Sequence, residues 1–220
     1  MRKIISSVFI SLDGVMQAAG GPEEDTTGGF TEGGWLPSFF DETVGARIDA
    51  LFDRDFDLLL GRKTYEIFAA HWPDVQDDPI GPLFDRVAKY VVTTSSEPLT
   101  WQNSHKVQGD IAGELKRMKQ ADGPDLLIQG SSMLYPLLFK AGLIDQLNIL
   151  TFPVILGHGK RLFAQGIPSG AWKLVEHSVS KSGVVMATYE PNGTIPPGNF
   201  QLAEPTDAEK ARRAKMKLEG

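Results

Sequence analysis

Two glycine-containing junctions carry the residues best suited to bind phosphate. Leu58–Glu66 reads LLLGRKTYE and Leu126–Tyr135 reads LLIQGSSMLY, and in each a short apolar run precedes a glycine and then hydroxyl or basic residues. We expect a buried strand that turns into a helix, so that backbone N–H groups and the positive end of the helix dipole face solvent. Two such phosphate sites in one sheet suit a ligand with phosphates in two places, such as a dinucleotide.

The first junction carries positive charge. Arg62 and Lys63 can pair with a phosphate, and Thr64 can cap the helix or donate a hydrogen bond at its first turn. An ordinary strand–helix turn with solvent-exposed basic residues would have the same sequence. This junction taken alone therefore favours neither interpretation.

Two further polar segments are expected at strand ends. Gln129–Ser132 is uncharged: Gly130 permits close backbone approach, while Ser131 or Ser132 could simply cap the following helix. Thr93–Ser96 reads TTSS and is expected at the carboxyl end of a parallel strand, the edge where α/β sheets bind ligands. Its hydroxyls can bind a phosphate or a ribose, although alone they are better interpreted as a turn. Three polar strand ends in one sheet together favour a ligand site.

Composition limits the classes of function. Of the 220 residues, 41% are hydrophobic and 23% charged, as in ordinary soluble globular domains. The chain has no cysteine, which excludes disulfides and thiolate metal sites and fits a reducing, cytoplasmic location. The net charge of −6 argues against nucleic-acid binding, and no apolar run approaches the roughly 18–20 residues of a membrane span. No metal site is expected, because the histidines lack an i, i+4 pair: they are His71, His105, His158 and His177.

Short β-rich segments alternate with helical patterns as far as Phe152, and an antiparallel pair follows. The expected strands are Lys3–Ser11, Asp57–Leu60, Tyr90–Thr94, Asp125–Ile128, Gln146–Phe152, Trp172–Ser180 and Val184–Glu190. The expected helices are Phe39–Phe52, Lys63–Ala70, Leu83–Val87, Ile111–Gln120 and Ser132–Lys140. This order predicts an α/β fold, with a mostly parallel central sheet flanked by helices and an antiparallel C-terminal hairpin. One domain is expected over residues 1–190, and residues 191–220 are expected to form a Pro/Gly-rich arm and a charged tail with a marginal helix.

Five motifs occur in the order and at the separations of a known superfamily. They are SLDGVM (Ser11–Met16), GRKTYE (Gly61–Glu66), VVTTS (Val91–Ser95), IQGSSMLYPLL (Ile128–Leu138) and GLIDQLNILTFPVILGHGKRLF (Gly142–Phe163). Over about residues 3–190 the chain resembles the dihydrofolate-reductase-like superfamily. Within it, the chain resembles the branch related to the reductase domain of the bifunctional riboflavin-biosynthesis deaminase–reductase. The segment ending PVILGHGKRLF is typical of that branch rather than of dihydrofolate reductase itself.

The resemblance implies NADPH as cofactor and hydride transfer to a C=N or C=O group of a small heterocyclic or sugar-linked substrate, as in 5-amino-6-(5-phosphoribosylamino)uracil reductase. The implied cofactor residues are Asp13, Gly14, Val15 and Met16 beside the nicotinamide, Gly61, Arg62, Lys63 and Thr64 at the pyrophosphate and 2′-phosphate, Thr94 and Ser95 at the adenosine, and Gln129, Gly130, Ser131, Ser132 and Met133 around the pyrophosphate. The loop Gln17–Trp35 would then form a lid over the nicotinamide, although Trp35 would equally suit the core.

Two departures separate the chain from members of known activity. Dihydrofolate reductase carries a carboxylate shortly after a Trp-x-x-Pro stretch, and here the nearest alignment places an aromatic residue there. Asp41 or Glu42 would replace it after a shift of one or two residues, but we prefer to interpret both as first-turn acids favoured by the helix dipole. The H-x-E and C-x-x-C zinc ligands of the deaminase domain have no counterpart in this sequence. No catalytic residue is assigned, and the candidates are Asp41, Glu42 and Asp13.

The leading hypothesis is an NADPH-dependent reductase that acts on a small molecule. One alternative is a non-catalytic NADP(H)-binding module or sensor, and another is a true dihydrofolate reductase, which the missing carboxylate disfavours. A nucleoside-phosphate-binding interaction protein would need only the two phosphate sites and would leave SLDGVM and the lid unexplained. The resemblance also implies a homodimer formed through the C-terminal strands.

Overall fold

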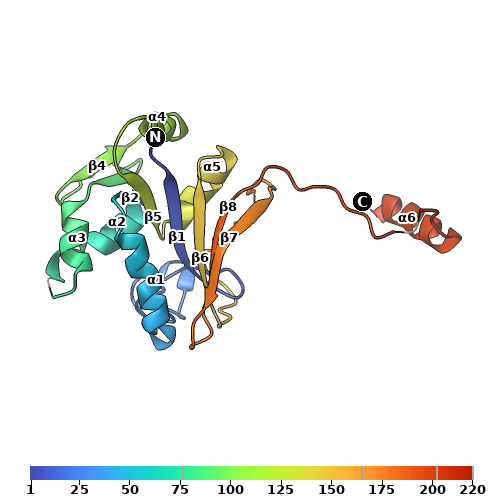
Figure 1. The fold of residues 1–220 in the computed structure, drawn as a ribbon, viewed down its shortest axis with the longest axis horizontal. Coiled ribbons are helices and arrows are strands. Elements are labelled where there is room, and N and C mark those ends of the chain that lie inside the picture. The colour runs from blue at the N-terminus through green and yellow to red at the C-terminus, as the bar shows by residue number, and fades with distance from the viewer. Residues whose placement is uncertain (76, 165, 202, 220) are drawn as a thin grey trace.

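The computed structural model describes residues 1–75, 77–164, 166–201 and 203–219. In these residues eight strands form a sheet in the order β4-β3-β2-β5-β1-β6-β8-β7 (Figure 1). The strands are β1 (Ile4–Ser11), β2 (Phe56–Gly61), β3 (Lys89–Val92), β4 (Ser104–Val107), β5 (Asp125–Gln129), β6 (Gln146–Phe152), β7 (Trp172–Val179) and β8 (Val185–Pro191). Strands β1 to β6 pair in parallel, and β8 joins β6 and β7 in antiparallel fashion. The predicted α/β fold is confirmed.

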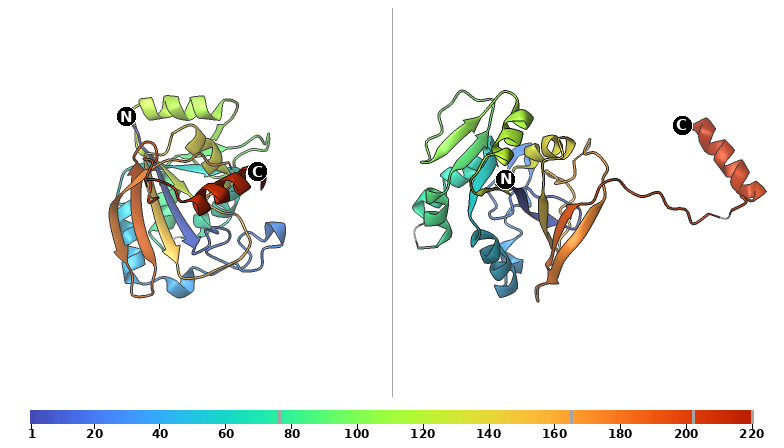
Figure 2. Two further views of the ribbon diagram at one scale, coloured as in Figure 1. Left: turned by 90° about the vertical axis from the view of Figure 1, so that its right-hand side faces the viewer. Right: turned by 45° about the horizontal axis from the view of Figure 1, so that its top comes forward.

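Helices cover both faces of the sheet, and the last helix lies apart from it (Figure 2). They are α1 (Glu42–Phe52), α2 (Arg62–Ala69), α3 (Ile80–Arg86), α4 (Ile111–Gln120), α5 (Tyr135–Lys140) and α6 (Asp207–Glu219). Short 3-10 turns are η1 (Thr27–Gly29), η2 (Pro37–Phe39), η3 (Trp72–Asp74) and η4 (Ser132–Leu134). Buried side chains of α4 and α5 pack in one core with Ile4 and Val8 of β1, whereas Ile5 packs with α2 and α3 on the opposite face. Strand β1 is buried on both faces, and its serines Ser6, Ser7 and Ser11 are buried along with its apolar side chains.

Several element boundaries follow the sequence and others differ. Helix α4 and strand β6 have the expected bounds. The expected helix Phe39–Phe52 is wrong at its start, because η2 ends at Phe39 and the Asp41 side chain caps α1, which begins at Glu42. Likewise, the expected helix over 132–140 opens with the 3-10 turn η4 before α5.

Strand β4 was not expected. It is four residues long, His105 and Lys106 in it are exposed, and it pairs in parallel with β3 at the edge of the sheet. A short edge strand with exposed polar side chains has no apolar alternation to reveal it.

The segment that follows β8 extends away from the sheet and ends in α6 (Figures 1 and 2). None of the described residues of α6 is buried. Leu202 and Gly220 of the expected tail 191–220, and Gln76 and Gln165 of the expected domain 1–190, lie outside the described residues. None of the helices in the described parts of the chain combines the length and apolar composition that a membrane span requires.

Candidate functional site

A large cavity lies at the carboxyl edge of the parallel strands. Its volume is about 1610 Å³, beyond the roughly 300–1,000 Å³ of a typical small-molecule pocket. Four segments that follow β1, β2, β3 and β5 contribute to its lining: Met16–Asp25, Gly61–Thr64, Val92–Ser95 and 129–134. Parallel strands bring their carboxyl ends to one edge, so the polar strand ends expected from the sequence share this cavity.

The two glycine junctions are joined by hydrogen bonds. The Gly61 amide donates to Ser131 Oγ at 2.9 Å, and the Ser131 amide donates to Thr64 Oγ1 at 3.1 Å. Ser131 adopts a left-handed backbone (φ +61°) after Gly130 (φ +59°), where an added Cβ would lie 3.4 Å from Thr64 Cγ2. Gly61 is the N-cap residue of α2, and it has no side chain that could cap the first-turn amides of this helix. These amides therefore remain available to an anion.

The cations at the first junction are already paired with carboxylates. Arg62 Nε lies 2.5 Å from Glu66 Oε1, and Arg62 Nη2 lies 3.1 Å from Glu97 Oε2. Lys63 Nζ lies 3.5 Å from Asp25 Oδ1 and its side chain is 48% exposed. A phosphate at this junction would compete with these acids for the two cations.

The first part of the Gln17–Trp35 loop, as far as Asp25, lines the cavity, and hydrogen bonds fix the loop. The side-chain amide of Gln17 donates to the carbonyl oxygens of Asp25 and Thr27, at 2.9 Å each, and the backbone carbonyl of Gln17 accepts from Trp35 Nε1 at 3.0 Å. The Asp25 carboxylate forms an ion pair with Lys160 as well as with Lys63. Burial alone would raise the pKa of Asp25, but hydrogen bonds from Lys160 and Thr27 outweigh it and hold the pKa below the ordinary value of an aspartate.

Of the expected nicotinamide segment, Met16 lines the cavity, whereas Asp13, Gly14 and Val15 are not among the lining residues. Asp13 accepts hydrogen bonds from the amides of Leu156 and Gly157 at 3.1 and 3.0 Å. The Ser11 hydroxyl, together with these amides, lowers the pKa of Asp13 to about 2. Asp13 therefore fixes the loop after β6, and a separate bond from the Leu162 amide to the Gly14 carbonyl holds the same loop.

The acids at the start of α1 also lie outside the cavity lining. Asp41 accepts hydrogen bonds from the amides of Thr43 and Val44, at 3.0 Å each, and of Ser182 at 2.9 Å. The Ser182 amide is the main cause that lowers the pKa of Asp41 to about 2. Glu42 is an exposed residue in the first turn of the same helix. These positions match the interpretation of both residues as helix-start acids.

At the adenosine end, Thr94 and Ser95 both line the cavity. Ser95 is held in a turn: its amide donates to Thr93 Oγ1 at 3.0 Å and its hydroxyl accepts from the Glu97 amide at 3.1 Å. Gln129, Gly130, Ser132 and Met133 are further lining residues. Met133 is 82% exposed at the cavity rim.

The other end of the cavity is apolar, and the sequence did not reveal it. Its lining includes Phe40, which precedes α1, and side chains of α1, α2, η3 and α3: Ile48, Phe52, Phe68, Trp72 and Phe84. The side chains of α1 and α2 here show only the ordinary spacing of a core face. Trp72 lines the cavity, whereas Tyr65 is buried and its hydroxyl accepts from the Trp101 amide at 2.8 Å. In the described parts of the chain, no cluster of three or more His, Cys, Asp or Glu residues is placed to hold a metal.

Solved structures share this fold. A putative riboflavin biosynthesis protein from Shewanella sp. PV-4 superposes with a TM-score of 0.66 at 22% identity, covering 87% of this chain and 99% of the other. Dihydrofolate reductase from Enterococcus faecalis, solved with NADP(H), gives 0.55 at 16% identity, covering 86% and 96%. A deaminase/5-amino-6-(5-phosphoribosylamino)uracil reductase from Thermotoga maritima gives 0.56 at 15% identity, covering 87% of this chain and 57% of the other.

Related sequences extend over most of the chain. An uncharacterised Bacillus subtilis (strain 168) protein, YyaP, is 26% identical over 200 residues, covering 87% of this chain and 96% of its own length. A second uncharacterised protein of that strain, YwjB, is 29% identical over 165 residues, covering 74% and 83%. Residues 2–186 match the family described as the RibD C-terminal domain. The chain, with its reductase-like fold, belongs to the RibD C-terminal domain family.

Proposed function

We propose that this protein is an NADPH-dependent reductase that transfers a hydride to a small heterocyclic or sugar-linked substrate. The observation that carries this proposal is one continuous cavity with two unlike ends. One end holds the joined glycine junctions and the Thr94–Ser95 strand end, and the other is lined by aromatic side chains. Its volume of about 1610 Å³ leaves room for a dinucleotide and a second, smaller molecule.

The residues at the polar end suit a phosphorylated dinucleotide. Gly130 and Ser131 both line the cavity in a left-handed backbone, and the absence of a Cβ at Gly130 lets this turn lie close to Thr64. The first-turn amides of α2 would hold the pyrophosphate, with Arg62 and Lys63 beside the 2′-phosphate. Thr94 and Ser95 would contact the adenosine, and Met16 would lie beside the nicotinamide. When bound, NADPH supplies the hydride.

The chain's own contribution is positioning and exclusion of water. The lid, fixed by Gln17 and by Asp25, would cover the reacting rings, and the aromatic end would orient the substrate. Asp41 and Glu42 lie outside the lining, so no carboxylate of α1 meets a pterin there. We therefore disfavour dihydrofolate as the substrate.

A second candidate is an NADP(H)-binding module without turnover. Asp41 and Glu42 favour it, because both lie at the start of α1 and neither lines the cavity. Such a module would bind the dinucleotide as tightly as a reductase does but would leave it unoxidised.

A ligand that binds only the native state raises the melting temperature, so thermal shift with NADPH is the first experiment. The second follows the absorbance of reduced nicotinamide with a panel of cyclic imines, conjugated carbonyl compounds and a reduced-pyrimidine ribityl precursor. We expect stabilisation and oxidation with part of the panel. Stabilisation without oxidation would favour the module, and no stabilisation would contradict both.

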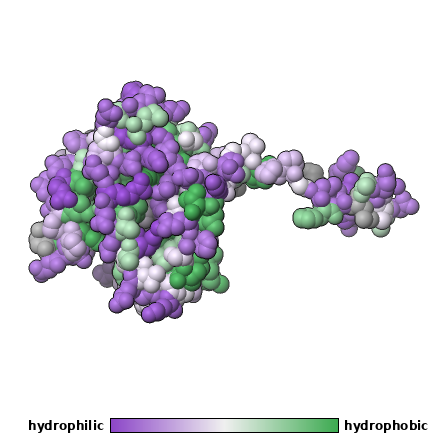
Figure 3. Space-filling model, in the orientation of Figure 1, coloured by the Kyte–Doolittle hydropathy of each residue, from purple (hydrophilic) through white to green (hydrophobic). Residues whose placement is uncertain are grey.

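We also propose a homodimer formed through the β7–β8 hairpin. Edge strand β7 leaves Leu174, Val175 and Val179 at least 43% exposed, and apolar surface is visible on that side in Figure 3. An unpaired edge with apolar side chains is a template for association. Light scattering should give twice the mass of the chain, and a strict monomer at high concentration would exclude the dimer.

A further inference from the structure

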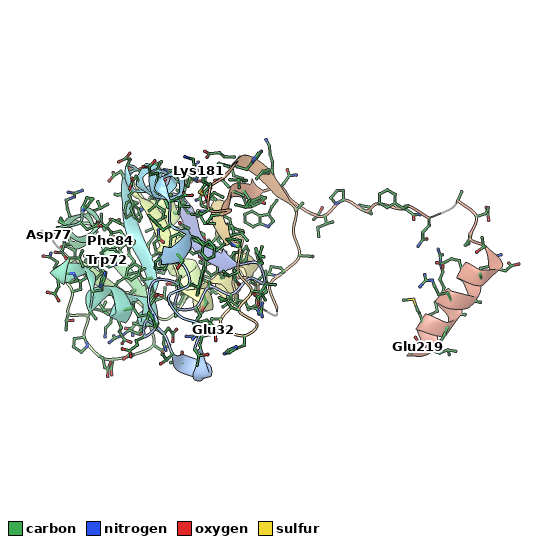
Figure 4. The ribbon with its side chains drawn as sticks, turned by 90° about the horizontal axis from the view of Figure 1, so that it is seen from below. Glu32, Trp72, Asp77, Phe84, Lys181 and Glu219 are labelled. Carbon is green, nitrogen blue, oxygen red and sulfur yellow. The ribbon has the colours of Figure 1, made fainter. Side chains whose placement is uncertain are left out.

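The apolar end of the cavity is a chamber with aromatic walls. We define the aromatic chamber by Phe40, Ile48, Phe52, Phe68, Trp72 and Phe84. Phe84 is 2% exposed and contacts the other rings of the wall, with its ring centroid 5.4 Å from that of Phe52 and 5.3 Å from that of Trp72 in edge contacts. Phe68 stacks on Phe84 at 5.8 Å. Figure 4 shows Trp72 and Phe84 together on one side of the molecule.

These rings hold one another in place. Phe52 also contacts Phe56 at 5.7 Å, and Phe68 contacts Trp72 at 6.2 Å, so each wall is supported by another. Flat faces and edges fixed in this way recognise a planar ring by stacking and edge contacts. An aliphatic chain would gain less from the same walls.

None of the six residues that define the aromatic chamber is a cation. The cations among the described lining residues are Arg62, Lys63 and Lys160. Arg62 opens α2 and Phe68 lies six residues further on, which places the two backbones about 9 Å apart at 1.5 Å per residue. Arg62 is turned to Glu66 and Glu97, and both lysines are paired with Asp25.

The aromatic chamber therefore offers no cation to an anionic substituent. His71 lines the cavity beside the chamber and lies on the exposed turn between α2 and η3. Its ring centroid lies 4.9 Å from that of Trp72. A phosphate or carboxylate moved into this chamber would lose its hydration without a charged partner.

We propose that the chamber binds an uncharged planar ring and discriminates against rings that carry a phosphate or carboxylate at that end. This deepens the proposed function and rests on it in one respect, that the bound ring is the hydride acceptor. It narrows the substrate to neutral aromatic or conjugated heterocyclic compounds. A phosphoribosyl substituent buried in the chamber is excluded.

Two isosteric probes test this selectivity without any turnover: naphthalene-2-carboxamide, which is neutral, and naphthalene-2-carboxylate, which is an anion at neutral pH. Binding to the full-length protein would be measured by calorimetry, with quenching of tryptophan fluorescence as a second signal. We expect the carboxamide to bind at least tenfold more tightly. Equal or tighter binding of the carboxylate, or no binding of either probe, would overturn the proposal.

A single substitution at the rim should reverse the preference. Phe40 is 48% exposed, so Phe40→Arg places a cation at the chamber without opening the core. The variant should lower the ratio of carboxamide to carboxylate affinity at least tenfold. Phe200→Arg is the matched control, since Phe200 is fully exposed in the segment after β8, and it should leave the ratio unchanged. An unchanged ratio in Phe40→Arg, at an unchanged melting temperature, would contradict the assignment of the chamber.

The same titrations separate this inference from the proposed function. NADPH binding to wild-type protein and to Phe40→Arg should be equal, because Phe40 lies at the apolar end. If the protein binds the carboxamide selectively but does not bind NADPH, the proposed reductase function is rejected and the proposed selectivity of the aromatic chamber is kept. If the protein binds NADPH firmly but does not discriminate between the two probes, the proposed selectivity of the chamber is rejected and the proposed reductase function is kept.

Discussion

The hydroxyl oxygen of Ser131 accepts the backbone N–H of Gly61 at 2.9 Å. This bond crosses between the ends of β5 and β2, which are adjacent strands in the sheet. A second bond returns from the Ser131 amide to Thr64. The two glycine junctions, 70 residues apart, thus form one unit, in which a non-glycine residue holds a left-handed backbone.

Ser131→Ala should destabilise the protein, because it leaves the Gly61 amide without its acceptor and keeps a Cβ in the left-handed conformation. A partly buried donor without a partner costs about 1–3 kcal/mol. Ser131→Gly should lose less, since glycine adopts this backbone freely. Urea unfolding would measure both, with Ser132→Ala as the control. Equal stability of Ser131→Ala and wild type would show that the bond does not hold the junctions together.

Asp25→Asn should loosen the lid. The substitution removes the charge that both Lys63 and Lys160 face, while Gln17 still holds the loop backbone. We expect proteolytic cleavage between residues 17 and 35 to become several-fold faster and NADPH to dissociate faster. Glu32→Gln, an exposed change in the same loop, is the control and should behave as wild type. Unchanged protection in Asp25→Asn would mean that the ion pairs do not close the lid.

Acid stability should depend on Asp41. The pKa of Asp41 is about 2 in the folded protein, against an ordinary value of 3.8 for an aspartate. A carboxyl group whose pKa is lower in the folded than in the unfolded state stabilises the protein at pH values above its unfolded-state pKa. That contribution is lost as the pH falls toward the folded-state pKa. Stability should therefore decrease from about pH 4 to about pH 2. Asp13 shares this direction, with a pKa of about 2.

Asp41→Asn keeps a side-chain oxygen at the helix start but removes the titration. Its unfolding free energy should be lower than that of wild type at pH 7 and should fall less steeply between about pH 4 and pH 2. Glu42→Gln changes the neighbouring exposed residue, and its unfolding free energy should depend on pH with the same slope as that of wild type. An identical acid slope for Asp41→Asn and wild type would contradict the role of this carboxylate.

Glu97 should weaken the interaction of Arg62 with a 2′-phosphate, because its carboxylate lies 3.1 Å from the guanidinium. Glu97→Gln should therefore raise the affinity for NADPH several-fold and leave that for NADH unchanged. Glu114→Gln is a matched control, since Glu114 pairs with Arg117 on α4. A parallel change for both dinucleotides would show that Glu97 does not compete with the phosphate.

Local patterns predicted the parts of the fold that local physics determines. Helix α4 has an amphipathic pattern and an Asp110 cap, and β6 is apolar and bounded by Pro153, so both bounds could be read from the sequence. The bounds of strand β4 could not be read from the sequence, since its pairing with β3 is specified by the edge of the sheet rather than by its own residues. The start of α1 depended on which acid caps it, and Asp41 is selected partly by Ser182, 141 residues away.

The candidate site was predictable to a similar extent. Glycine and hydroxyl residues after strands indicated the polar end of the cavity, because their role follows from backbone geometry at a strand end. The bond from Gly61 to Ser131 was not predictable, since nothing local indicates which of two serines reaches the neighbouring strand. The aromatic chamber was missed because Phe52 and Phe68 follow the same helical spacing as core residues, and only the packing of α1 against α2 and α3 leaves them facing a cavity.

Calorimetric titration of NADPH and NADH against wild-type protein and the double variant Arg62→Ala, Lys63→Ala tests the proposed cofactor site most directly. Hydrogen bonds to charged groups contribute about 1.5–3 kcal/mol each, so NADPH should bind wild type roughly tenfold or more tightly than NADH. The double variant should lose most of that preference and keep its affinity for NADH. Equal affinities of wild type for the two dinucleotides, or binding of neither, would contradict an NADPH site at these junctions.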